Sequence, residues 1–501
     1  MPIPNYREQV RFLLGQQEIK IGINNPNITL LEYLRLTARL TGTKEGCAEG
    51  DCGACTVLIG EIHQGNIRYQ PINACITLLG MVDNKQVHTV ETLAQDNVHP
   101  AQALMAEQHA SQCGYCTPGF VMSIAALQCD LGDKSQTKVG ASKAQIDDYL
   151  SGNLCRCTGY GPIINAAQEI SKKPLSSAWQ TQAQTAKKTI HEWMNDPRPL
   201  RCVGNKAIFV APNSLDTLHD ALLKHPDATL LGGATDVGLW ITKLGKRLTN
   251  IIYLGQVSEM RNVSQTEDTL EIGAGVSLQD TQLLLGSLTP DLEHLMRRFG
   301  ARQVRSQGTV GGNIANGSPI GDLPPALIAL GAKLEIAGAD GIRQIPLENF
   351  FIGYGKQDLS PGEFVRLIRI PINRNLHFRC WKISKRFDQD ISSLMGAFSA
   401  TVENNKFQDV RICFGGMAGT PKRASACEAV LLQQSVASDV LVHAKRALAR
   451  DFEPITDMRA SAEYRNYVAQ NLLEKFILSI NDKDQSILYK DTVWTTPAIH
   501  Q

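Results

Sequence analysis

The segment CAEGDCGACTVLIG, residues 47–60, places three cysteines within nine residues and separates them with glycines and small or acidic residues. Cys47, Cys52 and Cys55 have the spacing C-x4-C-x2-C, and Cys75 follows on the next apolar segment. This is the plant-type arrangement of thiolate ligands for a 2Fe–2S cluster. The glycines favour it further, because a loop around an inorganic cluster needs left-handed backbone positions and N–H groups aimed at sulfur.

A second group of four cysteines follows. The motif QCGYC contains Cys113 and Cys116, and NLCRC contains Cys155 and Cys157, each pair beside a predicted helix. Four such thiolates can hold a structural zinc ion or a second iron–sulfur cluster, and on the residues alone both remain open. The C-x-C half argues against zinc, whose paired ligands normally stand further apart. Unligated cysteines are a third alternative for either group.

The composition is that of an ordinary globular protein of several domains: 501 residues, 43% hydrophobic and 20% charged. Lys and Arg (50) almost cancel Asp and Glu (49), so no charge field favours nucleic acid or anionic lipid. The N-terminus does not resemble a secretion signal, and no apolar run approaches the ~20 residues that span a bilayer. We therefore expect a cytoplasmic protein that binds neither nucleic acid nor membrane, in which clustered cysteines are metal ligands rather than disulfides.

The hydrophobic pattern changes several times along the chain and predicts an α+β multidomain fold. We predict a β-rich domain over residues 1–84, a helical domain over 85–173, a linker over 174–200, a domain of alternating strands and helices over 201–380, and a further α+β domain over 381–490. The linker is predicted from its Ser, Thr, Gln, Ala and Lys content, with prolines at both ends.

Two glycine-rich stretches lie in the fourth segment: LLGGATDVG (residues 230–238) and QGTVGGNIANGSPIGDLPPAL (residues 307–327). A backbone without side chains can approach a pyrophosphate closely and turn its N–H groups toward the oxygens, so these stretches indicate a dinucleotide site. Neither is the G-x-G-x-x-G of a Rossmann fold, and ordinary turns between strands are the alternative.

The cysteine motifs together resemble a known family. CAEGDCGACTV with Cys75, SQCGYCTPGFVMS and LSGNLCRCTGYGPI, in this order, closely resemble the two 2Fe–2S domains of the molybdenum hydroxylases. The resemblance implies a ferredoxin-like β-grasp fold for the first domain and a four-helix bundle for the second. It also implies that Gln112 touches a pterin across an interface, and it makes both cysteine groups 2Fe–2S ligands. The implied ligands are Cys47, Cys52, Cys55, Cys75, Cys113, Cys116, Cys155 and Cys157.

The glycine-rich stretches resemble the FAD-binding domain of the xanthine dehydrogenases, of the vanillyl-alcohol-oxidase flavoprotein class, followed by a C-terminal domain like that of the CO dehydrogenase flavoprotein. Ala234 and Asn316 depart from the residues common in the family. The resemblance implies these FAD contacts: Leu230, Leu231, Gly232, Gly233, Ala234, Thr235, Asp236, Val237, Phe299, Thr309, Val310, Gly311, Gly312, Asn313, Asp322, Val365 and Lys382.

The resemblance covers about residues 7–480 and includes no molybdopterin-binding domain. It implies the small, electron-transferring subunit of a bacterial xanthine dehydrogenase, an oxidoreductase subunit with no catalytic side chain of its own. Two 2Fe–2S clusters and FAD would carry electrons to NAD⁺ from the molybdenum cofactor of a large partner subunit, during oxidation of hypoxanthine or xanthine to urate. A heterotetramer of two small and two large chains is implied.

Several alternatives stay open at this point. The partner could act on an aldehyde or another N-heterocycle, or O₂ could replace NAD⁺ as the acceptor. From a different class, the chain could be a zinc-stapled interaction scaffold whose glycine loops are only turns. The charged segment KRFDQDIS (residues 385–392) could be a solvated loop, or its Asp388 and Asp390 could position NAD⁺ beside the flavin.

Overall fold

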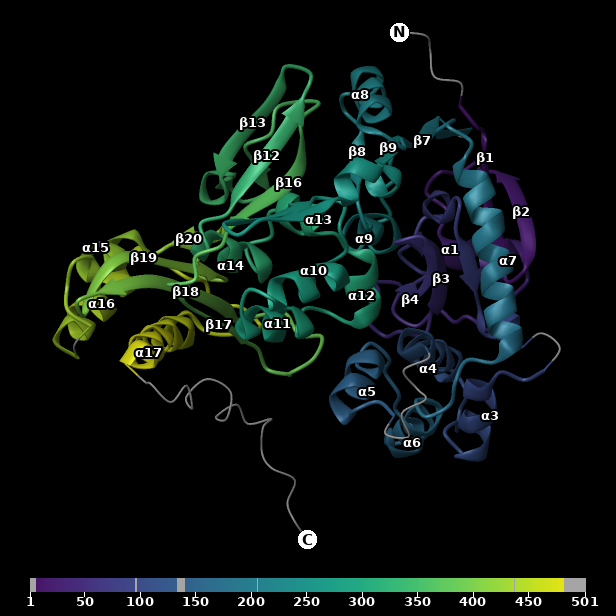
Figure 1. Cartoon of the computed structure of the whole chain (residues 1–501), viewed down its shortest axis with the longest axis horizontal. Helices are drawn as coiled ribbons and strands as arrows, with labels where there is room; N and C mark the ends of the chain where they lie inside the picture. The colour runs from purple at the N-terminus through teal and green to yellow at the C-terminus, as the bar shows by residue number, and fades with distance from the viewer. Residues whose placement is uncertain (1–5, 95–96, 133–139, 205, 437, 482–501) are drawn as a thin grey trace.

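The computed structural model describes residues 6–94, 97–132, 140–204, 206–436 and 438–481. Its elements form four units, which follow one another along the chain. Figure 1 shows the first unit and the helical unit at one end, the C-terminal unit at the other end and a third unit between them.

The first unit is a five-stranded sheet with the order β2-β1-β5-β3-β4. Strand β1 pairs antiparallel with β2 and parallel with β5, and β3 pairs antiparallel with β4 and β5. Helix α1 (Leu30–Glu32), capped by Thr29, continues as a π-helical turn over Tyr33–Thr37 and covers the sheet. This confirms the ferredoxin-like prediction. The strands are β1 (Gln9–Leu14), β2 (Gln17–Gly22), β3 (Thr56–His63), β4 (Asn66–Asn73) and β5 (Gln86–His88).

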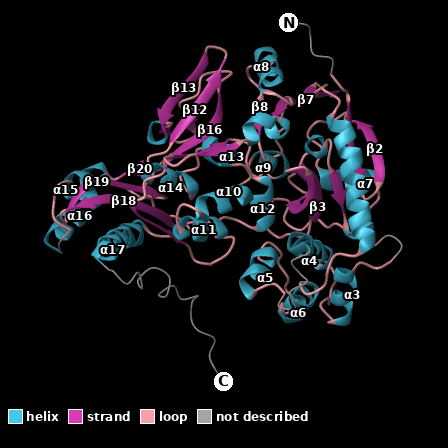
Figure 2. Ribbon diagram, viewed as in Figure 1, coloured by secondary structure: helices cyan, strands magenta, loops and turns pink. Residues whose placement is uncertain are grey.

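The helical unit begins with the short α2 and contains the four helices that the resemblance predicts (Figure 2). Pro118 lies in the first turn of α4, where a backbone N–H would have no partner within the helix. Helix α4 runs through the centre of the unit, and its residues 119–128 are buried. The helices are α2 (Val90–Leu93), α3 (Pro100–Glu107), α4 (Thr117–Leu131), α5 (Lys143–Leu150) and α6 (Gly161–Ile170).

Two predicted boundaries differ from the structure. Strand β5 lies beyond residue 84 and completes the first sheet. The segment expected to be a linker, 174–200, is mostly helix α7 (Ser177–Met194), which packs along β3 and β4. Its buried residues Ala186, Ile190 and Trp193 have the i, i+4, i+7 spacing of one helical face and form a small core with Leu13.

The third unit contains two larger sheets and a two-stranded one, β14-β15. One larger sheet has the order β6-β7-β9-β8, and the other has the order β10-β11-β16-β12-β13, with short helices between them. The first of these sheets shares one continuous hydrophobic core with the first unit, in which Phe209 of β7 and Val10 of β1 are both fully buried. The strands are β6 (Leu200–Gly204), β7 (Ala207–Ala211), β8 (Thr229–Leu231), β9 (Asn250–Tyr253), β10 (Val263–Gln265), β11 (Thr269–Gly273), β12 (Lys333–Gly338), β13 (Gly341–Pro346), β14 (Phe351–Gly353), β15 (Lys356–Gln357) and β16 (Phe364–Pro371). The helices are α8 (Leu215–Lys224), α9 (Val237–Thr242), α10 (Leu278–Gly286), α11 (Pro290–Arg297), α12 (Arg302–Gln307), α13 (Val310–Ala315) and α14 (Leu323–Ala329).

The C-terminal unit is an antiparallel sheet, β17-β18-β19-β20, covered by three helices. Its first strand begins at His377, a few residues before the boundary expected at 381, and residues 482–490 of the expected domain lie outside the described part. The elements are β17 (His377–Ile383), β18 (Leu394–Glu403), β19 (Lys406–Gly415), β20 (Lys422–Arg423), α15 (Ser425–Leu431), α16 (Ser438–Asp451) and α17 (Ala462–Asn481). Among the helices of the described residues, none is both long and apolar enough to cross a bilayer.

Candidate cofactor sites

The first cysteine group (Cys47, Cys52, Cys55 and Cys75) comes together at the end of the first sheet. The Cys47 thiol contacts the thiols of Cys52 and Cys75, and Cys75 also contacts Cys55. Cys55 and Cys75 are buried, whereas Cys47 and Cys52 are half-buried. The four predicted ligands therefore face one another, although 28 positions of sequence (47 to 75) separate the first from the last.

Backbone N–H groups surround the sulfur of Cys47. Those of Glu49, Asp51 and Cys52 donate to Cys47 Sγ at 3.4, 3.3 and 3.3 Å. Thiol hydrogen bonds from Cys52 and Cys75 outweigh burial and, together with the N–H groups, hold the pKa of Cys47 well below its usual range. The N–H groups thus favour a thiolate at Cys47, which is the form of cysteine that binds iron. Hydrogen bonds with neighbouring thiols, together with burial, raise the pKa of Cys52 and of Cys75.

The second cysteine group (Cys113, Cys116, Cys155 and Cys157) is also brought together, as two contacting pairs. The Cys116 thiol contacts that of Cys155, and the Cys157 thiol contacts that of Cys113. Cys113 and Cys157 are exposed. Within the described part of the chain, no three or more His, Cys, Asp or Glu side chains form a group around a single metal ion. Contacting pairs are what a two-iron cluster requires, because each iron takes two thiolates.

The two cysteine groups adjoin each other. The N–H of Leu154, the residue before Cys155, donates to the carbonyl of Cys52 at 3.0 Å. The hydroxyl of Tyr115, between Cys113 and Cys116, donates to the carbonyl of Glu45. The backbones of the two loops are therefore directly hydrogen-bonded to each other.

The first cysteine group also adjoins the third unit, through the helix that follows LLGGATDVG. Lys243 Nζ donates to the carbonyl of Cys47 at 2.8 Å and lies 3.2 Å from a carboxylate oxygen of Glu49. Thr242 Oγ1 donates to the carbonyl of Ala48 at 2.7 Å. The end of α9 therefore rests on the cysteine loop.

The two glycine-rich stretches meet face to face. A Cβ atom at Gly233 would overlap the carbonyl oxygen of Gln307, and one at Gly232 would lie 2.7 Å from Thr309 Oγ1. Thr309 caps α13 and accepts a hydrogen bond from Gly312 N at 3.0 Å. Between the stretches lies a mainly apolar cavity of about 80 Å³. Of the predicted FAD contacts, the cavity is lined by Leu230, Gly232, Thr309, Gly311, Gly312 and Val365.

Buried polar atoms beside these stretches lack partners. Asn313 Oδ1, Ser306 Oγ and Gln307 Nε2 are buried and accept or donate no hydrogen bond in the described part of the chain. Unpaired buried groups are costly, so they indicate a polar ligand that would satisfy them. Together with the close-packed glycine backbone, they fit a bound dinucleotide such as FAD.

Among the predicted FAD contacts that do not line the cavity, Asp322 and Lys382 are bonded to each other. Asp322 and Lys382 form a buried ion pair with Oδ2 and Nζ 2.5 Å apart, and Ser392 Oγ donates to the other carboxylate oxygen at 2.5 Å. Arg298 Nη1 donates to the carbonyl of Lys382 at 2.8 Å, and Phe299 is the next residue along the chain. Their contact with FAD stays a prediction.

The cavity has further lining residues that the sequence reasoning missed. The segment GAG at 273–275 was a usable signal, because it is a third glycine-containing turn after a strand. The others have no local signature, since they reach the cavity from separate strands and turns. The missed residues are Leu254, Gly255, Met260, Ala274, Gly275, Ala315, Leu359 and Phe364.

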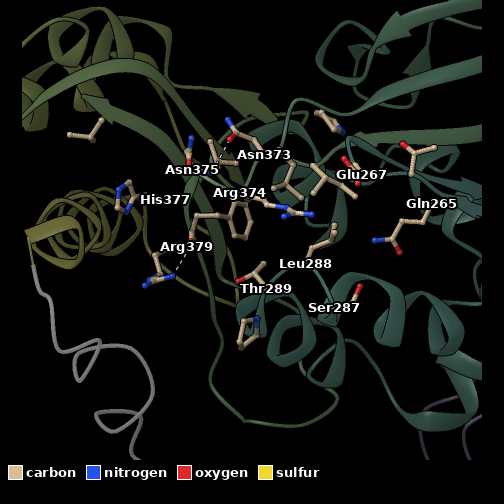
Figure 3. Close-up of a pocket in the computed structure, with 18 residues that line it drawn as sticks. Gln265, Glu267, Ser287, Leu288, Thr289, Asn373, Arg374, Asn375, His377 and Arg379 are labelled. Atoms are coloured by element: carbon tan, nitrogen blue, oxygen red, sulfur yellow. Dashed lines mark hydrogen bonds between the residues drawn. The ribbon is translucent and has the colours of Figure 1, made fainter. Parts of the chain in front are cut away.

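A larger cavity of the described residues lies elsewhere. It has a volume of about 780 Å³ and lies between the loop at 287–290 and the segment 371–379, and Arg374, His377 and Arg379 are among its residues (Figure 3). It contains none of the predicted cofactor contacts. Size therefore does not identify the cofactor site in this chain, whereas the convergence of glycines and thiols does.

Comparison with known domain families gives four matches, in the order of the units. Residues 13–79 match the 2Fe-2S iron-sulfur cluster binding domain, 89–168 the [2Fe-2S] binding domain, 204–373 the FAD binding domain in molybdopterin dehydrogenase, and 379–480 the CO dehydrogenase flavoprotein C-terminal domain. The second cysteine group lies within the second match, which favours a 2Fe–2S cluster over zinc at that site.

Curated relatives agree with these matches. The chain is 32% identical to xanthine dehydrogenase of Emericella nidulans over 85% of its own length and 35% of that protein. It is 30% identical to the xanthine dehydrogenase/oxidase of Mus musculus over 95% of its length and 39% of that protein. The chain thus spans less than two fifths of the length of these relatives.

Solved structures show the same fold over about half of the chain. A carbon monoxide dehydrogenase from Hydrogenophaga pseudoflava, in a form that lacks the Mo-pyranopterin moiety of its cofactor, has a TM-score of 0.50 and 26% identity over 55% of this chain and 95% of that one. A cyanide-inactivated Cu,Mo-CO dehydrogenase has a TM-score of 0.50 at 24% identity over 53% of this chain and 94% of that one.

Fold, thiol groups and domain matches define an oxidoreductase of the iron–sulfur flavoprotein class. Within that class, the chain belongs to the molybdenum hydroxylase family, whose two 2Fe–2S domains, FAD-binding domain and C-terminal flavoprotein domain it contains.

Proposed function

We propose that this chain is the electron-transferring subunit of a xanthine dehydrogenase. In this proposal, two 2Fe–2S clusters and FAD relay electrons to NAD⁺ from a molybdenum cofactor on a partner subunit, while hypoxanthine or xanthine is oxidised to urate. The main support is a continuous series of hydrogen bonds between the predicted cofactor sites. The segment before Cys155 is hydrogen-bonded to the Cys52 loop, and the Cys47 loop is hydrogen-bonded to the end of α9, which begins within the glycine-rich stretch 230–238.

The cofactors supply the redox chemistry: iron–sulfur clusters exchange single electrons, and FAD can collect a pair and pass a hydride to NAD⁺. The side chains of this chain hold and orient these groups. The eight cysteines would provide thiolates, and N–H groups at Cys47 would stabilise sulfur charge. The apposed glycine stretches would hold the pyrophosphate of FAD.

The proposed entry point for electrons is the exposed face around the second cysteine group. Cys113 and Cys157 reach solvent there, and Tyr115, Leu154 and Tyr160 beside them are 49%, 44% and 36% exposed. Exposed aromatic and aliphatic side chains around a functional group are typical of a docking surface. We propose that the molybdenum-bearing partner docks on this face, with Gln112 toward its pterin, in an assembly of two chains of each kind.

The proposed NAD⁺ contact is the segment 385–392, which lies beside Arg298. Arg298 Nη2 donates to Ser384 Oγ at 2.8 Å, and its guanidinium carbon lies 4.7 Å from the centre of the Phe387 ring. Burial, partly opposed by Arg297, raises the pKa of Asp388. Charge reversal of Asp388 and Asp390 should weaken the apparent affinity for NAD⁺ several-fold, and unchanged affinity would remove this segment from the site.

Metal analysis tests the ligand assignment. We expect Cys116→Ser to lose one of the two clusters, and so about half of the iron, while FAD remains bound. Cys129→Ser is the matched control, because Cys129 lies on α4, the helix that begins directly after Cys116, and outside both cysteine groups. Undiminished iron in Cys116→Ser would contradict the assignment. Substrate and acceptor are tested by pull-down of the tagged chain from its host, with molybdenum analysis and purine-dependent NAD⁺ reduction.

A further inference from the structure

One buried amide connects three units of the molecule. Gln303 of α12, in the third unit, is completely buried. Its Nε2 lies within donor distance of Thr56 Oγ1 in β3 (3.2 Å), Ser123 Oγ in α4 (3.2 Å) and Asn153 Oδ1 after α5 (3.0 Å). The first unit and the helical unit therefore both bond to the same side chain of the third unit.

Asn153 extends this junction to the cysteines. Its Nδ2 donates to the carbonyl of Gly53 at 3.0 Å, and Gly53 directly follows Cys52. The next residue, Leu154, donates its N–H to the carbonyl of Cys52 at 3.0 Å and directly precedes Cys155. The side chain that Gln303 bonds is thus the one that aligns the two cysteine loops.

The junction has no room for adjustment. A Cβ atom at Gly53 would overlap the carbonyl oxygen of Gly152, and one at Gly152 would overlap Gln303 Oε1. Gln303 Oε1 is buried and has no partner within the described residues. Because a buried acceptor without a partner costs stability, packing alone does not account for an amide at this position, whereas donation from Nε2 to Asn153 does.

We propose that Gln303 is a positioning residue that fixes the separation of the two iron–sulfur clusters, and hence the rate at which electrons pass between them. This inference rests on the proposed function, since it takes the eight cysteines as ligands of two clusters. Electron tunnelling falls exponentially with distance, so a small displacement of the Cys155 loop from the Cys52 loop slows transfer. The flavin-binding unit thereby determines the geometry of a step in which FAD takes no part.

The test is low-temperature electron paramagnetic resonance of the fully reduced holoprotein. Two paramagnetic clusters in proximity split each other's signals, and this splitting decreases with the cube of their distance. In Gln303→Met, which keeps the length of the side chain and removes its donor, we expect the splitting to decrease or vanish. The individual cluster signals, the iron content and bound FAD should persist, and stopped-flow reduction should show slower transfer between the clusters.

Gln128→Met is the matched control. Gln128 is a buried glutamine of α4 whose Nε2 donates to the carbonyls of Lys173 and Pro174 and whose Oε1 also lacks a partner among the described residues. Its substitution should lower thermal stability and leave the splitting unchanged.

A second variant, Gln303→Leu, is close in size and has no donor, so we expect the same loss of splitting. Unchanged splitting in either Gln303 variant with full iron would overturn the positioning role and leave the proposed function intact. A reconstituted wild-type chain without iron and acid-labile sulfide would overturn the proposed function itself.

Discussion

Acidification should destabilise the packing of the helical unit and α7 against the first sheet, because two histidines buried there are neutral in the folded protein. His88 ends β5 and His99 caps α3, and their rings lie 4.9 and 5.6 Å from that of Trp179 in α7. Burial lowers the pKa of each histidine from 6.5 to about 4. His99 Nδ1 accepts a hydrogen bond from Ala101 N at 3.1 Å, and protonation of this nitrogen would remove that bond.

The sign and size of the effect follow from these pKa values. When this region is unfolded, each histidine has its ordinary pKa of 6.5. Below that pH the unfolded form binds more protons than the folded form, so the free energy of unfolding falls as the pH falls. The contribution is fully present above about pH 6.5 and is lost progressively toward pH 4. Between pH 7.5 and 5 each histidine costs about 2 kcal/mol, and the pair costs about 4 kcal/mol when one opening exposes both rings.

Hydrogen exchange measures this opening directly. After correction for intrinsic exchange, protection of amides in α3 and α7 should fall about 1000-fold from pH 7.5 to 5. In His99→Asn, which keeps a cap acceptor and removes the titrating ring, the fall should be only about 30-fold. His191→Asn, on the exposed side of α7, is the control and should behave as the unsubstituted protein. An equal fall in His99→Asn and the unsubstituted protein would refute the burial argument.

Three further predictions concern the cofactor sites. Gly233→Ala places a methyl group against a facing carbonyl and should abolish retention of FAD on gel filtration, whereas Gly353→Ala, in open space, should retain it; FAD retained by both would contradict the loop geometry. Asp322→Asn leaves Lys382 buried without its carboxylate and should cost about 3–5 kcal/mol in urea unfolding of the third unit; a cost below about 1 kcal/mol, as for an exposed pair, would count against it. Lys243→Gln removes a cation from the Cys47 loop and should lower the reduction potential of that cluster by about 40 mV in a redox titration, leaving the other cluster unchanged; an equal shift of both would argue against a local effect.

Much of the cysteine chemistry could be predicted from sequence, because it depends on spacing within short loops. The C-x4-C-x2-C segment carries its own turns, and the structure brings Cys75 to it as expected. The glycine-rich stretches were recognisable for the same reason. Residues that reach the cavity from other strands, such as Met260 and Phe364, had no such signal, because their position depends on the packing of two sheets.

The segment predicted to be a linker is mostly helical, and the reason is physical. Polar residues dominate residues 174–200, and composition alone favours a flexible segment. The few apolar residues nevertheless recur at helical spacing, from Trp179 through Ala186 to Trp193, and the first sheet offers them an apolar face. The spacing of the apolar residues therefore predicts this helix better than the overall composition does, because a narrow stripe of apolar residues is enough for a helix to pack on a sheet.

The contacts between units favour a fixed rather than a hinged arrangement of the cofactors. Arg68 of β4 forms an ion pair with Asp280 of α10 at 2.6 Å, and beside it Glu61 lies near both Lys85 and Arg261. Burial alone would raise the pKa of Glu61, but these cations lower it to about 2, so the carboxylate stays charged at every physiological pH. These ion pairs connect the first and third units through β4 and α10. Helix α9 connects the same two units at a second place, the Cys47 loop. Two separate attachments prevent rotation about either one, so the distance between the first cysteine group and the glycine-rich stretches is set by the fold.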